Sequence, residues 1–497
     1  MKVKETINKY DWLTAQGCVT QAWFALRAVP EPPNEAARFR MEQGQEIGAL
    51  ARQLYPDGIL VGKTADQAVE QVTHQSIADP GVHTLFEAAF RAGRLVAKAD
   101  ILRRGHDGWH VLEVKSSFAE ATKSKMRSLV DDLAYTVMVL RQSGLQVSKA
   151  SLVLLSRSFR FGNATDQLFE IIDQTAEVND RVSEMNLVAA SITEAVFGNE
   201  PPDPVLSSTC RDCDFFDSQC LGAGVAHTVF EIPGLHHTKL KILADKGIVD
   251  LAKLPHDLEL KDTQERAKYS ILSGSTIVEP GLIKLLQAIE WPCRYLDFET
   301  VATALPMFAQ HGCHQQILTQ FSIHHLDDLN GDLSHSEFLA DAAVDGQREL
   351  AEALIDQLGT TGSILVYSSF EKTRIKALGK AFSDLAPKIE QIQARLIDLL
   401  PLIQNHVYHP RFGGRFSIKK VLPALVPELS YSGLAVANGD TAITRFARMA
   451  RGEISGADVA VTRDQLLEYC KMDTLAMVRL HQALNDLAAD RLVAGGG

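Results

Sequence analysis

The chain has 497 residues, of which 46% are hydrophobic and 23% are charged, and its formal net charge is −12. This length exceeds what one hydrophobic core usually supports, so we expect two or three domains. No apolar run approaches the ~20 residues of a transmembrane helix, and the N-terminus lacks the apolar core of a signal peptide, so we expect a cytoplasmic protein without membrane contact. The acidic balance argues against a general nucleic-acid-coating role, but it does not exclude an enzyme whose bound metals meet phosphates.

The first 60 residues are predicted to be helical, and the pattern changes to short strands between about 83 and 160. Strands at 95–102 and 109–115 form an expected hairpin, which a helix at 125–142 follows. Asp100 lies on the first strand, and Glu113 and Lys115 share one face of the second. Two acids can hold a divalent cation, and an adjacent lysine can stabilise charge on a phosphate or orient water. Surface ion pairs are the alternative interpretation.

This pattern resembles the core of the PD-(D/E)XK nucleases, which have a restriction-endonuclease-like fold. The resemblance implies that Asp100 and Glu113 bind a metal ion and that Lys115 is the catalytic lysine. Glu46, on the preceding helix, is a further candidate ligand. RecB-type members carry Gln-x-x-x-Tyr on the next helix, and this chain offers Tyr135 without the glutamine, so the substrate-side part of the motif is incomplete.

A predicted helix at 165–197 ends at a proline-rich stretch, and a cysteine cluster follows. In a cytosolic chain, cysteines indicate metal ligands or buried thiols rather than disulfides. A zinc finger would normally supply two close pairs, whereas this chain has three close cysteines and a distant fourth. The arrangement resembles the iron–sulfur staple of the RecB-type nucleases, including those of CRISPR spacer acquisition. It implies a [4Fe–4S] cluster, with structural Zn²⁺ or unligated thiols as alternatives, on Cys18, Cys210, Cys213 and Cys220.

The segment from 232 to 290 is expected to be small and helical. Residues 239–255, around Gly247, resemble helix-hairpin-helix modules, in which backbone N–H groups at the turn bind a phosphate. A packing linker between domains is the alternative.

From residue 291 onward, strands precede helices; the expected ranges are 294–299, 316–324, 363–367, 372–403 and 464–488. Asp297 and Glu299 share one face of the first strand, where two carboxylates in an apolar setting repel each other unless a cation lies between them. Glu371 opens the helix after a buried strand. Helical i, i+4 spacing places Tyr469 and Asp473 on one face. Several carboxylates together with a phenol suit hydrolysis by two metal ions. For Asp297 and Glu299 alone, the alternative is a surface strand with two solvated acids.

The ordered set resembles the tyrosine branch of the DnaQ-like 3′–5′ exonucleases, which have an RNase H-like fold. The resemblance implies that Tyr469 positions the attacking water and that the metals are bound by Asp297, Glu299, Glu371 and Asp473. The family's middle acid is usually an aspartate in Asn-x-x-Phe-Asp, whereas this chain has Ser-Ser-Phe-Glu. Asp398 is therefore a candidate substitute ligand.

Taken whole, the chain resembles a bacterial family that fuses a RecB-like nuclease domain to a DnaQ-like exonuclease domain. The resemblance implies an α/β protein with a restriction-endonuclease-like domain (1–225), a small helical linker domain (226–290), an RNase H-like domain (291–490) and a disordered tail (491–497). It implies a Mg²⁺- or Mn²⁺-dependent nuclease that acts on nucleic acid, DNA in preference to RNA, with protein partners in repair or phage defence. A catalytically impaired nucleic-acid-binding or assembly module, or an RNA-processing exonuclease that uses only the C-terminal site, are the alternatives.

Overall fold

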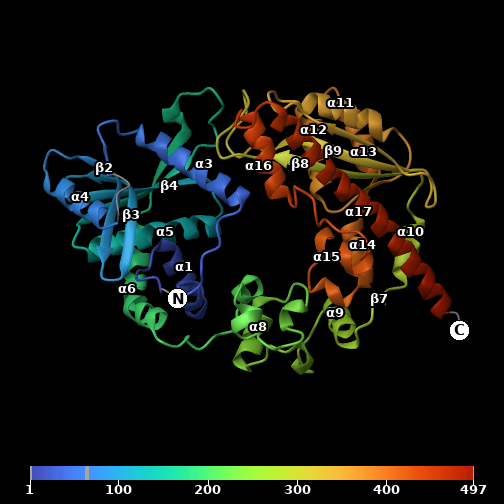
Figure 1. The fold of residues 1–497 in the computed structure, drawn as a ribbon, viewed down its shortest axis with the longest axis horizontal. Coiled ribbons are helices and arrows are strands. Elements are labelled where there is room, and N and C mark those ends of the chain that lie inside the picture. Colours follow the sequence, from blue (N-terminus) through green and yellow to red (C-terminus); the bar gives the residue numbers. More distant parts are fainter. Residues whose placement is uncertain (1–2, 62–65, 496–497) are drawn as a thin grey trace. The chain divides into compact units, whose positions relative to one another are not determined.

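The computed structural model describes residues 3–61 and 66–495 and is a mixed α/β structure (Figure 1). Contacts divide the chain into two compact units. The first comprises 1–205, 212–221 and 303–315, and the second comprises 206–211, 222–302 and 316–497. The predicted linker domain, 226–290, therefore groups with the second unit. Among the described residues, no helix has the length and apolarity needed to cross a membrane.

The first unit is built on a six-stranded sheet with its strands in chain order. The β1–β2 and β4–β5 pairs are parallel and the other neighbours are antiparallel. The predicted hairpin is present, formed by β3 and β4. The strand bounds are β1 Ile59–Leu60, β2 Thr84–Ala92, β3 Leu95–Arg104, β4 Trp109–Phe118, β5 Val147–Leu155 and β6 Phe169–Asp173.

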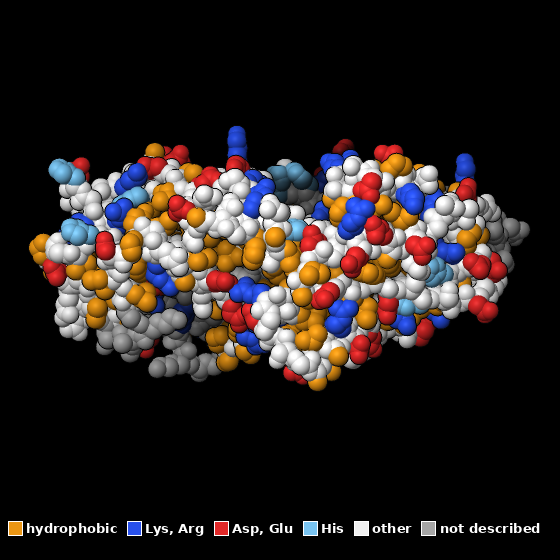
Figure 2. Space-filling model, turned by 90° about the horizontal axis from the view of Figure 1, so that it is seen from above, with side chains coloured by type: hydrophobic (Ala, Val, Ile, Leu, Met, Phe, Trp, Pro, Cys, Tyr) orange, Lys and Arg blue, Asp and Glu red, His pale blue; other side chains and the backbone are white. Residues whose placement is uncertain are grey.

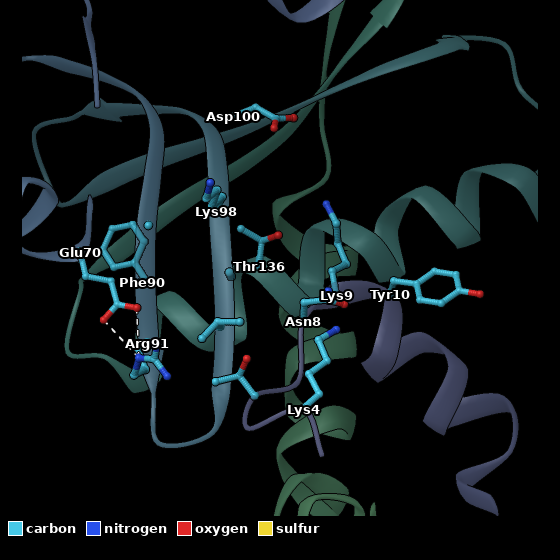
Figure 3. A pocket seen from close by; sticks show the side chains of 14 residues that line it. Lys4, Asn8, Lys9, Tyr10, Glu70, Phe90, Arg91, Lys98, Asp100 and Thr136 are labelled. Atoms are coloured by element: carbon cyan, nitrogen blue, oxygen red, sulfur yellow. Dashed lines mark hydrogen bonds and ion pairs between the residues drawn. The ribbon is translucent and has the colours of Figure 1, made fainter. Parts of the chain in front are cut away.

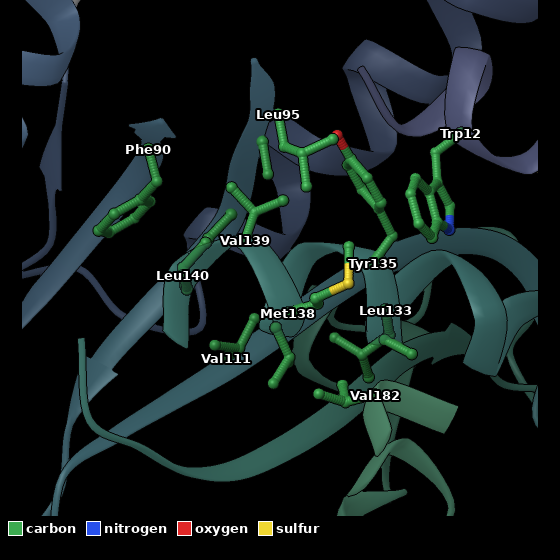
Figure 4. Close-up of a cluster of buried hydrophobic side chains, with 14 of the residues drawn as sticks. Trp12, Phe90, Leu95, Val111, Leu133, Tyr135, Met138, Val139, Leu140 and Val182 are labelled. Carbon is green, nitrogen blue, oxygen red and sulfur yellow. The ribbon is translucent and has the colours of Figure 1, made fainter. Parts of the chain in front are cut away.

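Helices cover both faces of this sheet, and each face has its own core. The larger core joins the strands to α5 and α6 and contains Tyr135, Trp12 and Met138 (Figure 4). The smaller core lies under α3 and includes Ile47, Phe86 and Ile101. Apolar side chains on both sides of a strand explain its nearly continuous hydrophobic sequence. The helix bounds are α1 Lys9–Gly17, α2 Val19–Ala25, α3 Glu35–Arg52, α4 Asp66–Ala78, α5 Lys123–Gln142, α6 Thr175–Phe197 and α7 Phe216–Gln219.

The second unit contains a five-stranded sheet in the order β10-β9-β8-β11-β12. The first three strands are antiparallel, and β11 and β12 run parallel to β8. Leu296 and Phe298 of β8 pack with α11, α12 and α13, so the alternate residues of β8 face α17 on the opposite side. The strand bounds are β8 Cys293–Val301, β9 Ile317–Leu326, β10 Ser334–Leu339, β11 Ile364–Val366 and β12 Leu396–Asp398.

Helices flank this sheet, and a two-stranded sheet lies apart from it. The small sheet pairs β7 (Ile277–Val278) with β13 (Val407–Tyr408). The helix bounds are α8 His237–Asp245, α9 Asp262–Ser273, α10 Gly281–Gln287, α11 Gln347–Leu358, α12 Phe370–Ala381, α13 Ala386–Ala394, α14 Leu399–His406, α15 Ile418–Leu425, α16 Gly439–Ala450 and α17 Ala457–Gly495. The 3-10 helices are η1 Thr165–Leu168, η2 Ser208–Asp212, η3 Val229–Glu231, η4 Leu251–Lys253 and η5 Pro410–Phe412.

Three predicted elements differ from the structure. The expected helix at 165–197 is a 3-10 turn, then strand β6, and only then α6, because 169–173 pair with β5. The second helix of the expected helix-hairpin-helix is only the three-residue η4. Of the predicted disordered tail, the residues up to Gly495 continue α17, and 496–497 lie outside the described residues.

One segment after β8 belongs to the first unit. Residues 303–315 connect β8 to β9, and their contacts are with the first unit. The Ala304 amide donates to the Gln43 side chain at 2.7 Å, and the Phe161 amide donates to the His311 carbonyl at 2.9 Å. Ala304 and Cys313 complete the core under α3.

Candidate metal centres

The second unit brings together the acidic side chains that alternate along β8. Tyr295, Asp297 and Glu299 all face α17, because the Tyr295 hydroxyl lies 2.8 Å from Nδ1 of His481 and the Cys470 thiol lies 3.7 Å from an Asp297 carboxylate oxygen. Asp297 and Glu299 are half-buried. Their position against a helix excludes the solvated surface strand that the sequence left open.

Asp473 of α17 completes a group of three carboxylates. One oxygen each from Asp297, Glu299 and Asp473 lie within 4.8 Å of one another. Asp473 is buried. Carboxylate oxygens gathered at this spacing are the ligands that Mg²⁺ and Mn²⁺ prefer.

Glu371 joins the group from the first turn of α12, immediately after β11. It is 4% exposed, and its charge raises the pKa of the Asp297 carboxyl, so the two groups lie close together. Ser368, in the turn between β11 and α12, has φ 149°, outside the usual range of non-glycine residues. Its hydroxyl donates to a Glu371 oxygen at 3.4 Å. Asp398 caps α14 by accepting from the Leu400 amide at 2.9 Å. The longer middle acid therefore reaches the site. Asp398 caps α14 through one oxygen, and its charge raises the pKa of Glu371, so it lies beside that acid.

Two residues that sequence reasoning did not assign complete the surroundings of Asp473 and Tyr469. The Lys419 amine donates to the Tyr469 hydroxyl at 3.1 Å and to the Ala437 carbonyl at 2.9 Å. The Tyr431 hydroxyl donates to Asp473 at 2.7 Å, and Tyr469 also hydrogen-bonds Asp473. The phenol of Tyr469 thus lies between an ammonium group and a carboxylate, which fixes its direction.

The carboxyl groups of this centre resist ionisation. Burial, followed by the charges of Asp473 and Glu371, raises the pKa of Asp297 and of Glu299 well above the ordinary values. Burial also raises the pKa of Asp473, although the Tyr431 hydrogen bond opposes the rise. The pKa of Glu371 rises to about 7, mainly through burial. Such a group either retains protons or requires a cation.

The first unit holds the second predicted constellation. Asp100 of β3 and Glu113 of β4 lie one position beyond the paired residues Ile101 and Leu112, so they face each other across the hairpin. Asp100 accepts from the Val114 amide at 2.8 Å. Burial, then the Glu113 charge, raises the pKa of Asp100 to about 7. The hairpin therefore brings the two acids together as the sequence predicted.

Glu113 is 1% exposed and lies between two lysines. Its Oε1 accepts from Lys9 of α1 and lies 3.1 Å from Nζ of Lys115, which also lies 2.5 Å from Asp132 of α5. Burial favours the neutral acid, but Lys9 and Lys115 outweigh it and lower the pKa of Glu113. Oε2 of Glu113 has no hydrogen-bond partner within the described part of the chain. A buried, ionised oxygen without a partner fits a metal ligand.

Two other predicted positions near this centre behave differently. The Tyr135 hydroxyl donates to the carbonyls of Ile7 and Val96 at 2.8 and 3.1 Å, so Tyr135 holds α5 to the N-terminal segment instead of facing substrate. Glu46 is half-buried on α3. The α3 residues that line a cavity next to Asp100 include Met41, Gln45 and Arg52 but not Glu46.

The cysteines predicted to bind a cluster occupy two parts of the chain. Cys18 caps α2, accepting from the Gln21 amide at 3.4 Å. Cys213 and Cys220 flank α7 in the first unit, whereas Cys210 lies in η2, in the segment assigned to the second unit. Phe24 of α2 stacks on Phe215 with ring centroids 5.3 Å apart. This stacking places the helix that follows Cys18 against the segment between Cys213 and Cys220.

We predict that the metal-free protein loses stability as pH rises from about 5 to 8. The pKa of Glu371 rises from 4.5 to about 7, and that of Asp100 from 3.8 to about 7, so the folded state binds more protons than the unfolded state in this window. For buried Glu371 the shift corresponds to about 3 kcal/mol. Thermal unfolding in a chelator across this window should show the decline, and adding Mn²⁺ should reverse it most strongly at pH 8. A melting temperature that rises with pH, with no effect of Mn²⁺, would contradict this account.

Comparison with known proteins adds two findings. Residues 294–417, which include Asp297, Glu299 and Glu371, match a family described as "Domain of unknown function (DUF2779)". The chain is also 27% identical over 222 residues to an uncharacterized protein of Mycoplasma pneumoniae, named as an MG366 homolog. That similarity covers 40% of this chain and 33% of the relative, so the chain spans about a third of the relative's length.

Proposed function

We propose that this protein is a divalent-cation-dependent nuclease that hydrolyses phosphodiester bonds of nucleic acid, DNA in preference to RNA. The observation that carries the proposal is the convergence of four acids and a phenol from three separate elements of the second unit. These are Asp297, Glu299, Glu371, Asp473 and Tyr469. The preference for DNA rests on analogy with the nuclease families that the sequence resembles.

The residues present suit the chemistry. Bound Mg²⁺ or Mn²⁺ would supply Lewis acidity toward phosphate oxygens and a hydroxide nucleophile at neutral pH. Asp297, Glu299, Glu371 and Asp473 would hold the ions. Tyr469, fixed by Lys419, would direct its hydroxyl toward the attacking water, as the resemblance to the DnaQ-like exonucleases implies.

The topology of the two sheets supports the assignment of each unit to a nuclease fold. In the second unit, three antiparallel strands precede two parallel ones, with the acids on the central strand β8, as expected for an RNase H-like exonuclease domain. In the first unit, a mixed sheet carries Asp100 and the Glu113/Lys115 pair on adjacent strands, as expected for a PD-(D/E)XK domain. Because Oε2 of Glu113 has no partner among the described residues, the second centre is proposed to bind a cation too.

Cleavage assays on the full-length protein test the proposal. Wild type, Lys115→Ala and Asp297→Asn would be incubated with end-labelled single- and double-stranded DNA and RNA, with Mg²⁺, Mn²⁺ or a chelator. If Asp297→Asn lost 3′-end trimming and Lys115→Ala kept it, the exonuclease activity would be assigned to the second unit. If freshly purified wild type cleaved none of the substrates with either cation, the protein would be a nucleic-acid-binding or assembly module. Cleavage of RNA only would favour the RNA-processing alternative.

The cysteine set is proposed to hold a [4Fe–4S] cluster, because thiolates suit it and α2 packs on the cysteine segment. Trp23 of α2 also donates to the carbonyl of Gly198, the C-cap of α6, at 2.8 Å. We predict that anaerobically purified wild type absorbs near ~400 nm and that Cys18→Ser removes this absorbance. Cys313→Ala, in a buried thiol outside the set, is the control and should retain it. If metal analysis found stoichiometric zinc and no iron, the cysteines would bind structural Zn²⁺ instead of a cluster.

We further predict that Lys419→Met slows exonucleolytic trimming about 100-fold at saturating substrate, while KM changes little. The Lys419 ammonium orients the Tyr469 hydroxyl and offsets the charge of Glu299, and one positioned polar group contributes about this factor. Lys419→Arg should recover part of the loss. Lys420→Met, in the exposed neighbour, is the matched control. If Lys419→Met and Lys420→Met trimmed DNA at equal rates, Lys419 would not have the proposed role of orienting Tyr469.

A further inference from the structure

Lys9 reaches the candidate centre of the first unit from outside the sequence motif. It is the first residue of α1, and its amine donates to Oε1 of Glu113. Its side chain also lines a cavity of about 550 Å³ together with Asp100 (Figure 3). Burial opposes the ionised form of Glu113, whereas the charge of Lys9, followed by that of Lys115, lowers the pKa of this carboxyl. Lys9 therefore lies beside both acids that are proposed to bind a metal ion.

The chain directly before Lys9 is held in place on both sides. Asn8, the N-cap of α1, accepts from the Asp11 amide at 3.0 Å, and the Asp11 carboxylate accepts from the Asn8 amide at 2.9 Å. One residue earlier, the Ile7 carbonyl accepts from the Val96 amide of β3 at 2.9 Å. The Lys9 side chain thus starts from a defined place next to the sheet that carries the centre.

The two carboxylate oxygens of Glu113 have different surroundings. Oε1 accepts from Lys9 and lies 3.1 Å from the Lys115 amine, which also lies 2.5 Å from Asp132. Oε2 is buried, and no described residue offers it a hydrogen bond. A buried, ionised oxygen is costly unless a donor or a cation completes its surroundings. The two lysines therefore occupy one oxygen of Glu113 and leave the other for a metal ion.

The charges around Glu113 leave room for one divalent cation. When Asp100 is ionised, three acids face two lysines; these residues are Asp100, Glu113, Asp132, Lys9 and Lys115. One negative charge is left over, so one divalent cation leaves a single positive charge in excess, and two such cations would leave three. Several unbalanced like charges at short range in a buried site are strongly unfavourable.

The centre of the second unit has a different balance. Its four acids face one lysine, Lys419, so two divalent cations there leave only a single positive charge in excess. That balance suits hydrolysis by two metal ions. On the face in Figure 2, Lys and Arg side chains are scattered among acidic and apolar ones. The contrast between the two centres is therefore a property of their buried groups, and Lys9 makes the difference in the first.

From this geometry we infer that Lys9 is a resident cation of the first unit's centre, which fills the place of a second metal ion and limits the centre to one divalent cation, bound on the Oε2 side of Glu113. The inference rests on the proposed nuclease function, because it concerns one of the same centres. It adds the number of ions that this centre takes and the residue that sets this number. Because Lys9 carries a like charge, it also weakens the binding of that ion.

Counting bound Mn²⁺ tests the inference without any cleavage assay. The full-length Asp297→Asn/Asp473→Asn protein, in which the other centre has lost two charges, would be titrated with Mn²⁺ while electron paramagnetic resonance measures the free ion. Adding Glu113→Gln should remove one bound Mn²⁺. If this change removed two ions, Lys9 would not take the place of a second one, and the inference would be overturned. If it removed none, the proposed metal-binding role of Glu113 itself would be contradicted.

Substitutions of Lys9 in the same background separate its charge from its hydrogen bond. Lys9→Gln can still donate to Glu113 but carries no charge, so it should bind Mn²⁺ about ten-fold more tightly or better. Lys9→Arg keeps the charge and should bind Mn²⁺ as the lysine does. Lys4→Gln is the matched control, because Lys4 lines the same cavity and pairs with Asp11 at 2.5 Å. An Mn²⁺ affinity that Lys9→Gln leaves unchanged or weakens would overturn the inference, although the centre would still bind its ion.

Discussion

Asp297→Asn is expected to reduce hydrolysis by the C-terminal centre about 1,000-fold or more, while raising the melting temperature of the metal-free protein. The loss follows because Asp297 belongs to the three-carboxylate group and also lies close to Glu371, so an ion held by these acids would lose a shared ligand. The gain follows because the amide carries no charge, and the repulsion that raises the pKa of Asp297 disappears. Each kcal/mol regained would raise the melting temperature by about 2–4 °C.

The hydrolysis rate and the melting temperature should be measured together. Rates of 3′-end trimming and thermal unfolding, each with chelator and with Mn²⁺, would be measured on the same preparations. Mn²⁺ should stabilise wild type more than Asp297→Asn, because the variant lacks a ligand. Asp327→Asn, in a carboxylate that is 85% exposed, is the control and should change neither quantity. A destabilised metal-free Asp297→Asn protein would show that the four acids do not repel one another as described.

Lys115→Met, in the Asp297→Asn background, is expected to reduce the remaining cleavage of DNA about 1,000-fold. The Lys115 amine lies between Glu113 and Asp132, so its removal takes away the cation proposed to stabilise charge on the phosphate and leaves Glu113 with Lys9 alone. Breaking this buried pair should also cost about 3 kcal/mol of folding stability, measured by denaturant titration.

A second variant separates lost chemistry from lost structure. Asp100→Asn should abolish the same cleavage and yet stabilise the metal-free protein, because burial and the Glu113 charge raise the pKa of Asp100 to about 7. Lys149→Met, in an exposed lysine on β5, is the matched control for Lys115→Met. Full cleavage by the Asp100→Asn protein would remove the metal role assigned to Asp100.

Features that depend on local periodicity could be predicted from the sequence. Alternation along β8 placed Asp297 and Glu299 on one face, and the i, i+4 rule placed Tyr469 and Asp473 together. The β3–β4 hairpin was also predictable, because its turn is marked by Gly105 and Gly108. In each case a few neighbouring residues determine the geometry.

Features that depend on contacts between distant segments could not be predicted in this way. Lys9 reaches Glu113 across 104 positions of the chain, and Tyr431 reaches Asp473 across 42. Neither spacing has a local signature. The same reason explains β6: pairing with β5 overrides the helical pattern expected from residue 165 onward.

The segment 303–315 has a consequence for how the two halves of this protein can be separated. It belongs to the first unit, although it follows β8 of the second, and Ala304 and Cys313 fill the core under α3. A fragment that ends at residue 225 would expose that core, and a fragment that begins at 291 would carry an orphaned apolar loop. A single recombination junction therefore cannot transfer either unit intact, so the two are expected to have been inherited together and to vary together.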